Sequence, residues 1–284
     1  KNKMKLLIGI FLFLSGLVFG QNNSLLYQIK GPGKKVSYLF GTIHMIPDSL
    51  YYFPGKLDKL IAKSDEVVLE IAQLADQGSM MELMTLKSGS CFDIFTGEQK
   101  DSVINWGATL LGVKPEQFEK AFEKRKPFTL LQLSFQKMIT GKIRMVDMEI
   151  ESRAQSDHIP VSGLETVEYQ LAIFDKIPAS EMAAFIMETV RHPDEGEENF
   201  RKMVAFYHQQ DLESLAKLIL ESDELGSSAE ELLDKRNHNW IPQMTERMKT
   251  KSCFFAVGAG HLGGPNGVID LLRKAGYEVT PVRY

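Results

Sequence analysis

Two stretches near opposite ends of the chain share one layout: an apolar run, a glycine-containing turn and then a histidine. The apolar runs are Val36 to Phe40 and Cys253 to Val257, followed by Gly41-Thr42-Ile43-His44 and Gly258-Ala259-Gly260-His261. Short apolar runs bounded by turn residues predict buried strands, and open α/β sheets bind ligands just past the carboxyl ends of their strands. A lone histidine there is more often a core residue. The repetition favours a site that His44 and His261 share.

Strand and helix patterns alternate on either side of a long helical stretch. Leu25 to Lys30 and Val36 to Phe40 predict a hairpin, because Gly31-Pro32-Gly33 separates them. A helix that begins at Pro54 then leads to the acidic-apolar run Glu66 to Ile71. A connection of this length predicts parallel pairing through a right-handed crossover. His44 and Glu70 are therefore expected at the same edge of the sheet.

The rest of the chain completes an α/β pattern. Residues 75–140 predict a mostly helical insertion, interrupted by glycine and proline. Further strands are expected at Ile143–Val146, at the run that ends in Glu165, and at Tyr277–Val282. Helices are expected at Met80–Leu86, Gln99–Leu111, Pro115–Lys124, Phe128–Ile139, Glu149–Gln155, Tyr169–Lys176, Ala179–Val190, Glu197–Gln209, Leu212–Glu221, Ala229–Lys249 and Val268–Ala275, with a polar loop at His192–Gly196. The predicted fold is a mixed, largely parallel central sheet flanked by helices, with a mostly helical insertion.

The first twenty residues have the order of a secretory signal peptide. Three lysines precede the apolar run Leu6 to Phe19, and a small and polar stretch follows from Gly20. We expect residues 1–20 to be a signal peptide, with an uncleaved anchor as the alternative, and residues 21–284 to be one domain. The predicted location is periplasmic or extracellular. In that oxidising environment Cys91 and Cys253 either form one disulfide or are two buried thiols.

The overall charge gives no reason to expect an anionic partner. The formal net charge is −4, whereas binding to nucleic acid or to an anionic membrane surface depends on a basic surface. We therefore expect neither nucleic acid nor, apart from an uncleaved leader, a membrane as partner.

Arg236 lies on the apolar face of a predicted helix, with Leu232, Leu233, Trp240 and Met244 at spacings of three and four residues. A cation in this position has a carboxylate or a bound anion as its partner, unless its head reaches the surface.

Five acidic or imidazole side chains follow predicted strands: His44, Glu70, Asp147, Glu165 and His261. If those strands are parallel neighbours, these groups converge at one rim. Two histidines and a carboxylate, with room for water, are a typical ligand set for a catalytic divalent ion. For Asp147 and Glu165 the alternative is a turn or capping role, and Glu165 is placed to cap the helix that follows it.

The segment Gly258-Ala259-Gly260-His261-Leu262-Gly263 also matches the dinucleotide-binding pattern Gly-x-Gly-x-x-Gly. The match is weak, since no acidic residue closes the next predicted strand. An NAD-dependent enzyme is therefore a third alternative.

The two Gly-x-x-His motifs, together with Glu70, Gly163-Leu164-Glu165-Thr166 and Arg236-Asn237 ahead of Trp240, resemble the TraB/PrgY/GumN family, which includes the Tiki proteases. This resemblance implies a fold related to erythromycin esterases and a haem-binding lipoprotein. It implies His44, Glu70 and His261 as metal or catalytic residues, and places Glu165 and Arg236 in further family motifs.

We therefore expect an exported metal-dependent hydrolase that cleaves peptides or other small hydrolysable substrates. His44, Glu70, His261 and Glu165 are the expected ligands of a divalent ion, which would be manganese, cobalt or zinc. Glu70 and Arg236 are the expected catalytic residues, with Arg236 holding a substrate carboxylate or the developing oxyanion. The alternative is a non-enzymatic haem- or metal-binding protein, which would need an apolar cleft with a Tyr or His ligand.

Overall fold

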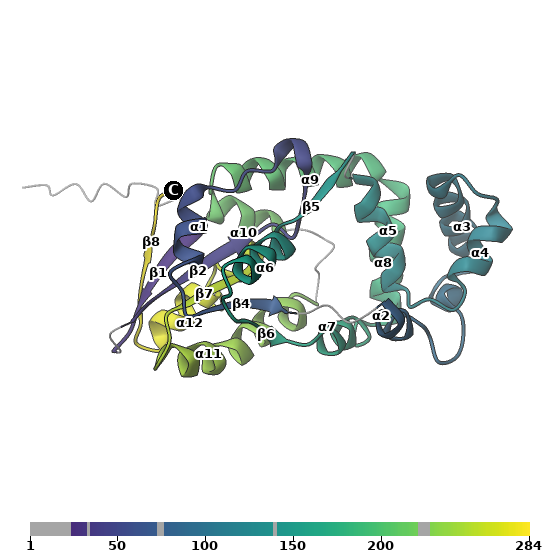
Figure 1. Ribbon diagram of the computed structural model, residues 1–284. Helices are drawn as coiled ribbons and strands as arrows, with labels where there is room; N and C mark the ends of the chain where they lie inside the picture. Colours follow the sequence, from purple (N-terminus) through teal and green to yellow (C-terminus); the bar gives the residue numbers. More distant parts are fainter. Residues whose placement is uncertain (1–23, 33–34, 73–76, 139–140, 221–227) are drawn as a thin grey trace, which may run out of the picture.

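A six-stranded sheet forms the centre of the computed structural model, which describes residues 24–32, 35–72, 77–138, 141–220 and 228–284. Its strand order is β6-β4-β7-β2-β1-β8. The strands are β1 (Leu26–Lys30), β2 (Val36–Thr42), β4 (Glu66–Ile71), β6 (Val161–Glu165), β7 (Cys253–Gly258) and β8 (Glu278–Pro281). β6, β4, β7 and β2 are mutually parallel, and β1 is antiparallel to both of its neighbours. The predicted mixed, largely parallel sheet is thus confirmed (Figure 1).

The prediction that β2 and β4 pair directly is wrong. Both strands are parallel, as expected, but β7 lies between them and pairs with each. All six residues of β7 are buried, and a strand without a solvent-exposed face is stabilised best between two partners. β7, from the far end of the chain, therefore lies between β2 and β4, although these two strands are consecutive neighbours in the sequence of the central sheet.

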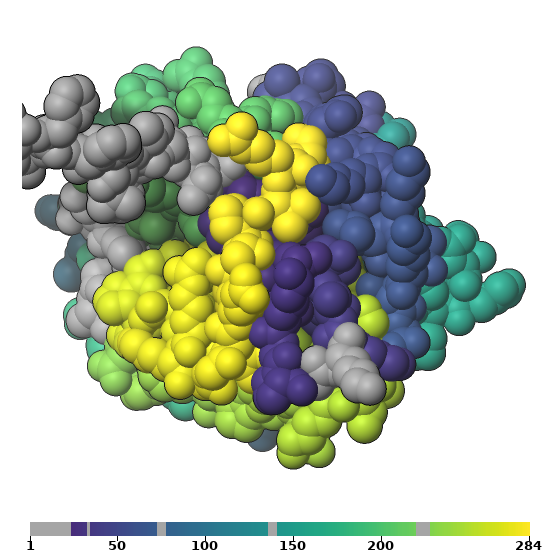
Figure 2. Space-filling view, turned by 90° about the vertical axis from the view of Figure 1, so that its left-hand side faces the viewer, coloured from purple at the N-terminus to yellow at the C-terminus, as the bar shows by residue number. Residues whose placement is uncertain are grey.

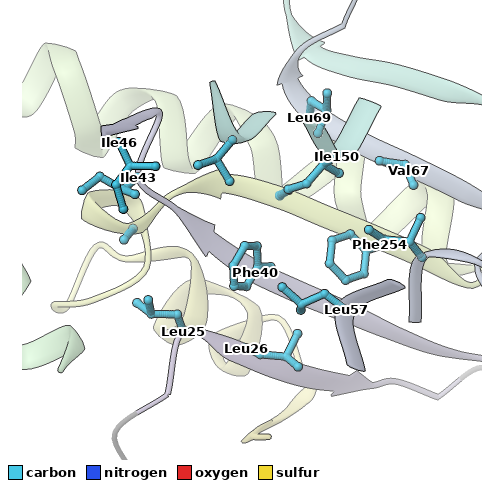
Figure 3. Close-up of a cluster of buried hydrophobic side chains, with 14 of the residues drawn as sticks. Leu25, Leu26, Phe40, Ile43, Ile46, Leu57, Val67, Leu69, Ile150 and Phe254 are labelled. Carbon is cyan, nitrogen blue, oxygen red and sulfur yellow. The ribbon is translucent and has the colours of Figure 1, made fainter. Parts of the chain in front are cut away.

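Helices cover both faces of the sheet. Phe254 and Phe255, which follow one another in β7, point to opposite faces and enter separate apolar clusters. One cluster packs against α1 (Gly55–Ile61) and α6 (Val146–Ser156), and Figure 3 shows Leu57 and Ile150 from these helices near Phe40 and Phe254. The other cluster packs against α11 (Lys235–Met248) and α12 (Val268–Lys274). The sheet is therefore the middle of three layers.

Most predicted helices are confirmed. They are α2 (Gln77–Leu83), α3 (Gly97–Leu111), α4 (Pro115–Phe122), α5 (Phe128–Met138), α7 (Val167–Phe174), α8 (Ala179–Arg191), α9 (Pro193–His208) and α10 (Leu212–Leu220). The predicted loop at His192–Gly196 is wrong, since α9 already begins at Pro193. A proline at the first helical position is favourable because its missing N–H would have had no partner there. Packing between α3, α4, α5 and α8 gives this helical region its own apolar cluster.

The predicted strand before Asp147 forms as β5 (Ile143–Met145), but it is not a parallel neighbour of the other strands in the central sheet. It pairs antiparallel with β3 (Met45–Pro47), a short strand just after His44. Asp147 therefore reaches the sheet edge from the first turn of α6 rather than from a central strand.

The helix predicted from Ala229 has two parts. A π-helical segment, Glu230–Asp234, comes first and α11 follows directly, so Pro242 lies inside a continuous helix. Single π-helical turns within α-helices are frequent at functional sites. This one directly precedes Arg236.

The two ends of the described chain meet at one edge of the sheet. β1 and β8 pair side by side, and Figure 2 shows the purple amino-terminal and yellow carboxyl-terminal segments in contact on this face. The predicted leader, residues 1–20, lies outside the described residues. Within the described ranges no helix is both long and apolar enough to cross a membrane.

Both cysteines are free and buried, so the two-thiol alternative holds. Cys91 lies in the helical cluster and Cys253 in the cluster under α11 and α12. Burial raises the pKa of each thiol to about 12, which makes both of them poor nucleophiles.

Gly107 provides a test of the helical region, because a Cβ there would lie 2.0 Å from the Phe118 ring. We expect Gly107→Ala to lower the free energy of unfolding by about 1–3 kcal/mol through overpacking. Gly97→Ala, at the start of the same helix with no atom within 4 Å of the added Cβ, should be neutral or slightly stabilising. Urea unfolding measures both changes, and equal stabilities of the two variants would contradict the packing of α3 on α4.

Candidate functional site

Four parallel strands deliver polar residues to one edge of the sheet. Glu70 and Glu165 lie at the ends of β4 and β6, and His44 and His261 follow β2 and β7. The register aligns these ends, since Thr42 pairs with Gly258 and Ile71 with Glu165. The structure thus brings together four side chains that are far apart in sequence.

Asp147 fixes the orientation of His44. Its Oδ2 lies 2.6 Å from Nδ1 of the ring, and its Oδ1 accepts a 3.0 Å hydrogen bond from the Thr42 hydroxyl. The other ring nitrogen, Nε2, lies 3.9 Å from Oε1 of Glu70. Desolvation opposes the charge on His44, but Asp147 and Glu70 outweigh it and raise its pKa to about 9. The side chain is 53% exposed, so this half of the site is open to solvent.

Glu70 is the centre of the site. Its Oε1 accepts a 2.7 Å hydrogen bond from the Gly258 backbone and lies 3.7 Å from Nε2 of His261. Its Oε2 accepts hydrogen bonds from Arg236 at 2.5 Å and from Gln170 at 3.1 Å. Burial alone would raise the pKa of this carboxyl, but His44, Arg236 and the Gly258 N–H together hold it well below its usual range. Glu70 is therefore ionised at any physiological pH.

His261 is buried and neutral. The amide nitrogen of Asn237 donates to the carbonyl of Asn266 at 2.8 Å, so its Oδ1, at 2.7 Å from His261 Nδ1, must accept a hydrogen bond from the ring N–H. This places the lone pair on Nε2, which accepts a 3.1 Å hydrogen bond from Arg236 and lies 3.7 Å from Oε1 of Glu70. Burial, with Arg236 close by, lowers the pKa of His261 to about 3.

Arg236 has a protein partner for every one of its N–H groups. Nε donates to Glu165, Nη2 donates to Glu70 and Glu165, and Nη1 donates to the Leu232 carbonyl and to His261. The predicted role, in which Arg236 holds a substrate carboxylate or an oxyanion, needs a free donor. The guanidinium bridges Glu70 and Glu165 instead. The carboxylate partner that the sequence predicts for Arg236 is therefore supplied by two residues of the protein.

Glu165, an expected ligand, points to Arg236 and to other donors. Besides Arg236 it accepts hydrogen bonds from Trp240 Nε1 at 2.8 Å and Gln170 Nε2 at 3.0 Å, and its side chain is 3% exposed. The predicted capping alternative does not apply either, since Thr166 caps α7 by accepting from the Tyr169 N–H.

Sequence reasoning missed Gln170, which bridges both glutamates. It lies on α7 in the turn after Glu165. A glutamine at a helix start is common, and nothing in its spacing indicates that both carboxylates are within its reach.

Gly258 keeps the space between His44 and Glu70 open. A Cβ at this position would lie 2.9 Å from His44 Nε2 and 3.3 Å from Glu70 Oε1. Only glycine therefore leaves room for an atom between these two groups.

The site residues offer the ligand types of a divalent ion, and Glu70 can share one with either histidine. Two atoms bound to one ion lie at most about 4.2 Å apart when each bond is about 2.1 Å, and Glu70 Oε1 meets this limit toward both rings. The ring nitrogens of His44 and His261 are more than 4.8 Å apart, so one ring must move before both can bind the same ion. Asp147 and Asn237 orient the rings as carboxylate and amide partners do around bound metals. His261 can join as a ligand only when Arg236 gives up its contact with Nε2. Both oxygens of Glu165 already accept hydrogen bonds from Arg236, Trp240 or Gln170, so this predicted ligand offers no free oxygen to the ion.

A second group of potential ligands lies elsewhere. Within the described ranges, the only three ligand atoms already within 4.8 Å of one another belong to Glu188, His192 and Glu195, all exposed where α8 meets α9. Exposed acidic groups of this kind are common on protein surfaces, and this group serves below as a control.

The dinucleotide alternative lacks its structural context. After β7 the chain forms a 3₁₀ turn, Ala259–His261, and α12 begins only at Val268. A pyrophosphate site of this type needs the glycine turn to open directly into a helix.

Comparison with known proteins gives matches of two kinds. The chain is 23% identical to the uncharacterized protein YbaP of Shigella flexneri over 243 residues, 85% of this chain and 89% of that protein. It is 49% identical to metalloprotease TIKI2 of Xenopus tropicalis over 53 residues and 46% identical to metalloprotease TIKI1 of Homo sapiens over 52. These segments are 18% and 17% of this chain, and the chain spans only 10% of each of these Tiki proteins. No solved structure matches the chain.

The model of the TraB/PrgY/gumN family matches residues 25–281, which include all four strand ends of the site. The chain therefore belongs to the TraB/PrgY/gumN family.

Proposed function

We propose that the chain is a metal-dependent hydrolase that cleaves peptides. One observation carries the proposal: a single ionised oxygen, Oε1 of Glu70, faces two imidazole nitrogens that come from different strands and are each oriented by a further side chain. The short similarity to metalloproteases named Tiki supports the reaction class.

His44, Glu70 and His261 would hold the ion. When bound, a divalent ion lowers the pKa of a water molecule and polarises a carbonyl. Nitrogen and carboxylate ligands of this kind suit manganese, cobalt or zinc. The half-exposed face of His44 is the side from which a peptide and water reach the site. In peptide hydrolysis the water oxygen bonds to the carbonyl carbon, the C–N bond breaks, and the departing amine gains the proton.

Arg236 and Glu165 act as positioning residues in this proposal. Glu165 holds the guanidinium on one side, and the guanidinium holds Oε2 of Glu70 on the other. This arrangement turns Oε1 of Glu70 toward the two rings. The nearby Gln170 hydrogen-bonds to both carboxylates and restrains them in the same way.

The haem-binding alternative meets one of its two requirements. A large apolar cavity lies beside Arg236, but the described residues that line it include no tyrosine or histidine. We therefore favour the hydrolase. Export and peptide substrates stay predictions from the sequence, as does the absence of nucleic-acid partners.

The ligand set is tested by His44→Ala, Glu70→Gln and His261→Ala, with His192→Ala as the matched control in the second group of ligands. Each of the three variants should lose bound manganese, cobalt or zinc and lower peptide cleavage at least a hundredfold, while His192→Ala keeps both. Metal content after stripping and reloading, with cleavage of a peptide library, measures the effect. Loss of the metal in His192→Ala alone would place the ion on the surface instead.

Gly258→Ala should lower activity at least tenfold without unfolding the protein, because its methyl group would occupy the space beside His44 Nε2. Gly260→Ala should keep most of the activity, since its Cβ meets only the end of the Ile219 side chain, at 3.0 Å. Cleavage rates and NAD titration measure both variants. If the wild type binds NAD and both variants weaken that binding, the dinucleotide alternative is correct.

The positioning role of Arg236 is tested through stability in metal-free protein. Arg236→Met should lower the free energy of unfolding by about 3–5 kcal/mol, because two buried carboxylates lose their cation. Adding Glu165→Gln should recover part of that loss, since one of the unpaired charges is gone. Urea unfolding measures the cycle, with the exposed Arg191→Met as control, expected to change stability by less than about 0.5 kcal/mol. An equal cost for Arg236→Met and Arg191→Met would show that the ion pair is not formed.

A further inference from the structure

An apolar cavity of about 410 Å³ lies among the helices beyond the carboxyl ends of the strands. Figure 1 shows α5, α7 and α8 beyond this end of the sheet. Phe128 of α5, Phe174 of α7 and Phe185 of α8 line the cavity together with Leu218 of α10. Phe128 and Phe174 stack with ring centroids 3.8 Å apart. Cavities of about 300–1,000 Å³ hold drug-sized ligands, so this one has room for one or two bulky side chains.

The cavity adjoins the proposed metal site. Arg236 lines it and also bonds to Glu70 and His261, so one guanidinium separates the cavity from the reacting groups. Ile219, another lining residue, lies close to Gly260 in the turn that carries His261. A ligand in the cavity would therefore lie next to the site.

The polar groups of the lining favour a neutral ligand. The hydroxyls of Ser134 and Thr189 donate to carbonyls of their own helices, Leu131 and Phe185. The remaining polar residue of the described lining, Asn199, is exposed and carries a neutral amide. Arg236, the only cation among the described lining residues, has a protein partner for each N–H. A fatty acid or a haem brings carboxylates, which need a cation with free donors. Apolar side chains of a peptide need none.

We propose that this cavity is the specificity pocket of the chain and binds large apolar side chains of a peptide next to the scissile bond. The proposal rests on the peptidase function proposed above. The pocket adds binding energy on the side of Glu70 that faces Arg236, while His44 stays open to solvent.

The first experiment uses metal-free protein, so that it does not depend on cleavage. A neutral fluorescent probe, N-phenyl-1-naphthylamine, should bind to the wild type and be displaced by N-acetyl-phenylalaninamide but not by N-acetyl-alaninamide. Leu218→Trp should weaken probe binding at least tenfold by filling the cavity. Leu111→Trp, at a 48% exposed leucine on α3, is the matched control and should bind as the wild type does. Displacement by palmitate or haemin, but not by the phenylalanine amide, would overturn the proposal.

The second experiment compares cleavage of peptides that differ in one residue, Ala, Leu, Phe or Trp, on either side of the scissile bond. The metal-loaded wild type should favour Phe over Ala by about 10–200-fold in kcat/KM, the range expected for apolar pockets. Leu218→Trp should reduce this preference at least tenfold, whereas the control Leu111→Trp should keep both the preference and the rate on the Ala peptide. Leu218→Ala should shift the preference toward Trp, which guards against a fold defect in the larger variant.

The outcomes separate the two proposals. Cleavage with no preference for Phe over Ala, unchanged in both Leu218 variants, would overturn the pocket and leave the peptidase in place. Specific binding of the phenylalanine amide without cleavage of any peptide under any metal would refute the peptidase, and with it the pocket's role in cleavage.

Discussion

The guanidinium of Arg236 between Glu70 and Glu165 is the interaction on which the site depends. Two adjacent parallel strands end in buried carboxylates that would repel one another without a shared cation. Arg236 supplies that cation from α11, the helix that also carries Asn237 and Trp240. The ion pair therefore docks the helix on the sheet edge and, through Asn237, sets the direction of His261.

This arrangement also explains why the chemistry and the cavity adjoin. Arg236 uses all of its donors on the protein, so the surface that it presents to the cavity offers no hydrogen bond to a ligand. Aromatic and aliphatic side chains line this cavity next to a guanidinium whose N–H groups are all hydrogen-bonded to the protein. Such a lining favours neutral, apolar ligands. Metal binding at one face of the site and substrate selection at the other are thus separated by a single side chain.

Much of the site follows from the sequence, because parallel strands end at one edge and His44 and Glu70 each end a strand. Asp147 was expected at that edge but arrives from a helix, since β5 pairs with β3 instead of the central sheet. The order of the strands was not predictable from short connections, because β7 inserts from the far end of the chain. Gln170 was not predictable at all, since only the folded structure places its amide between two carboxylates.

The central claim is that His44, Glu70 and His261 hold one ion. The most direct test is an anomalous diffraction map of crystals soaked in manganese or cobalt. We expect a peak within about 2.3 Å of Nε2 of His44 and Oε1 of Glu70, with Arg236 Nη1 displaced from His261. A peak confined to Glu188, His192 and Glu195, or no peak beside Glu70 at saturating metal, would contradict the account.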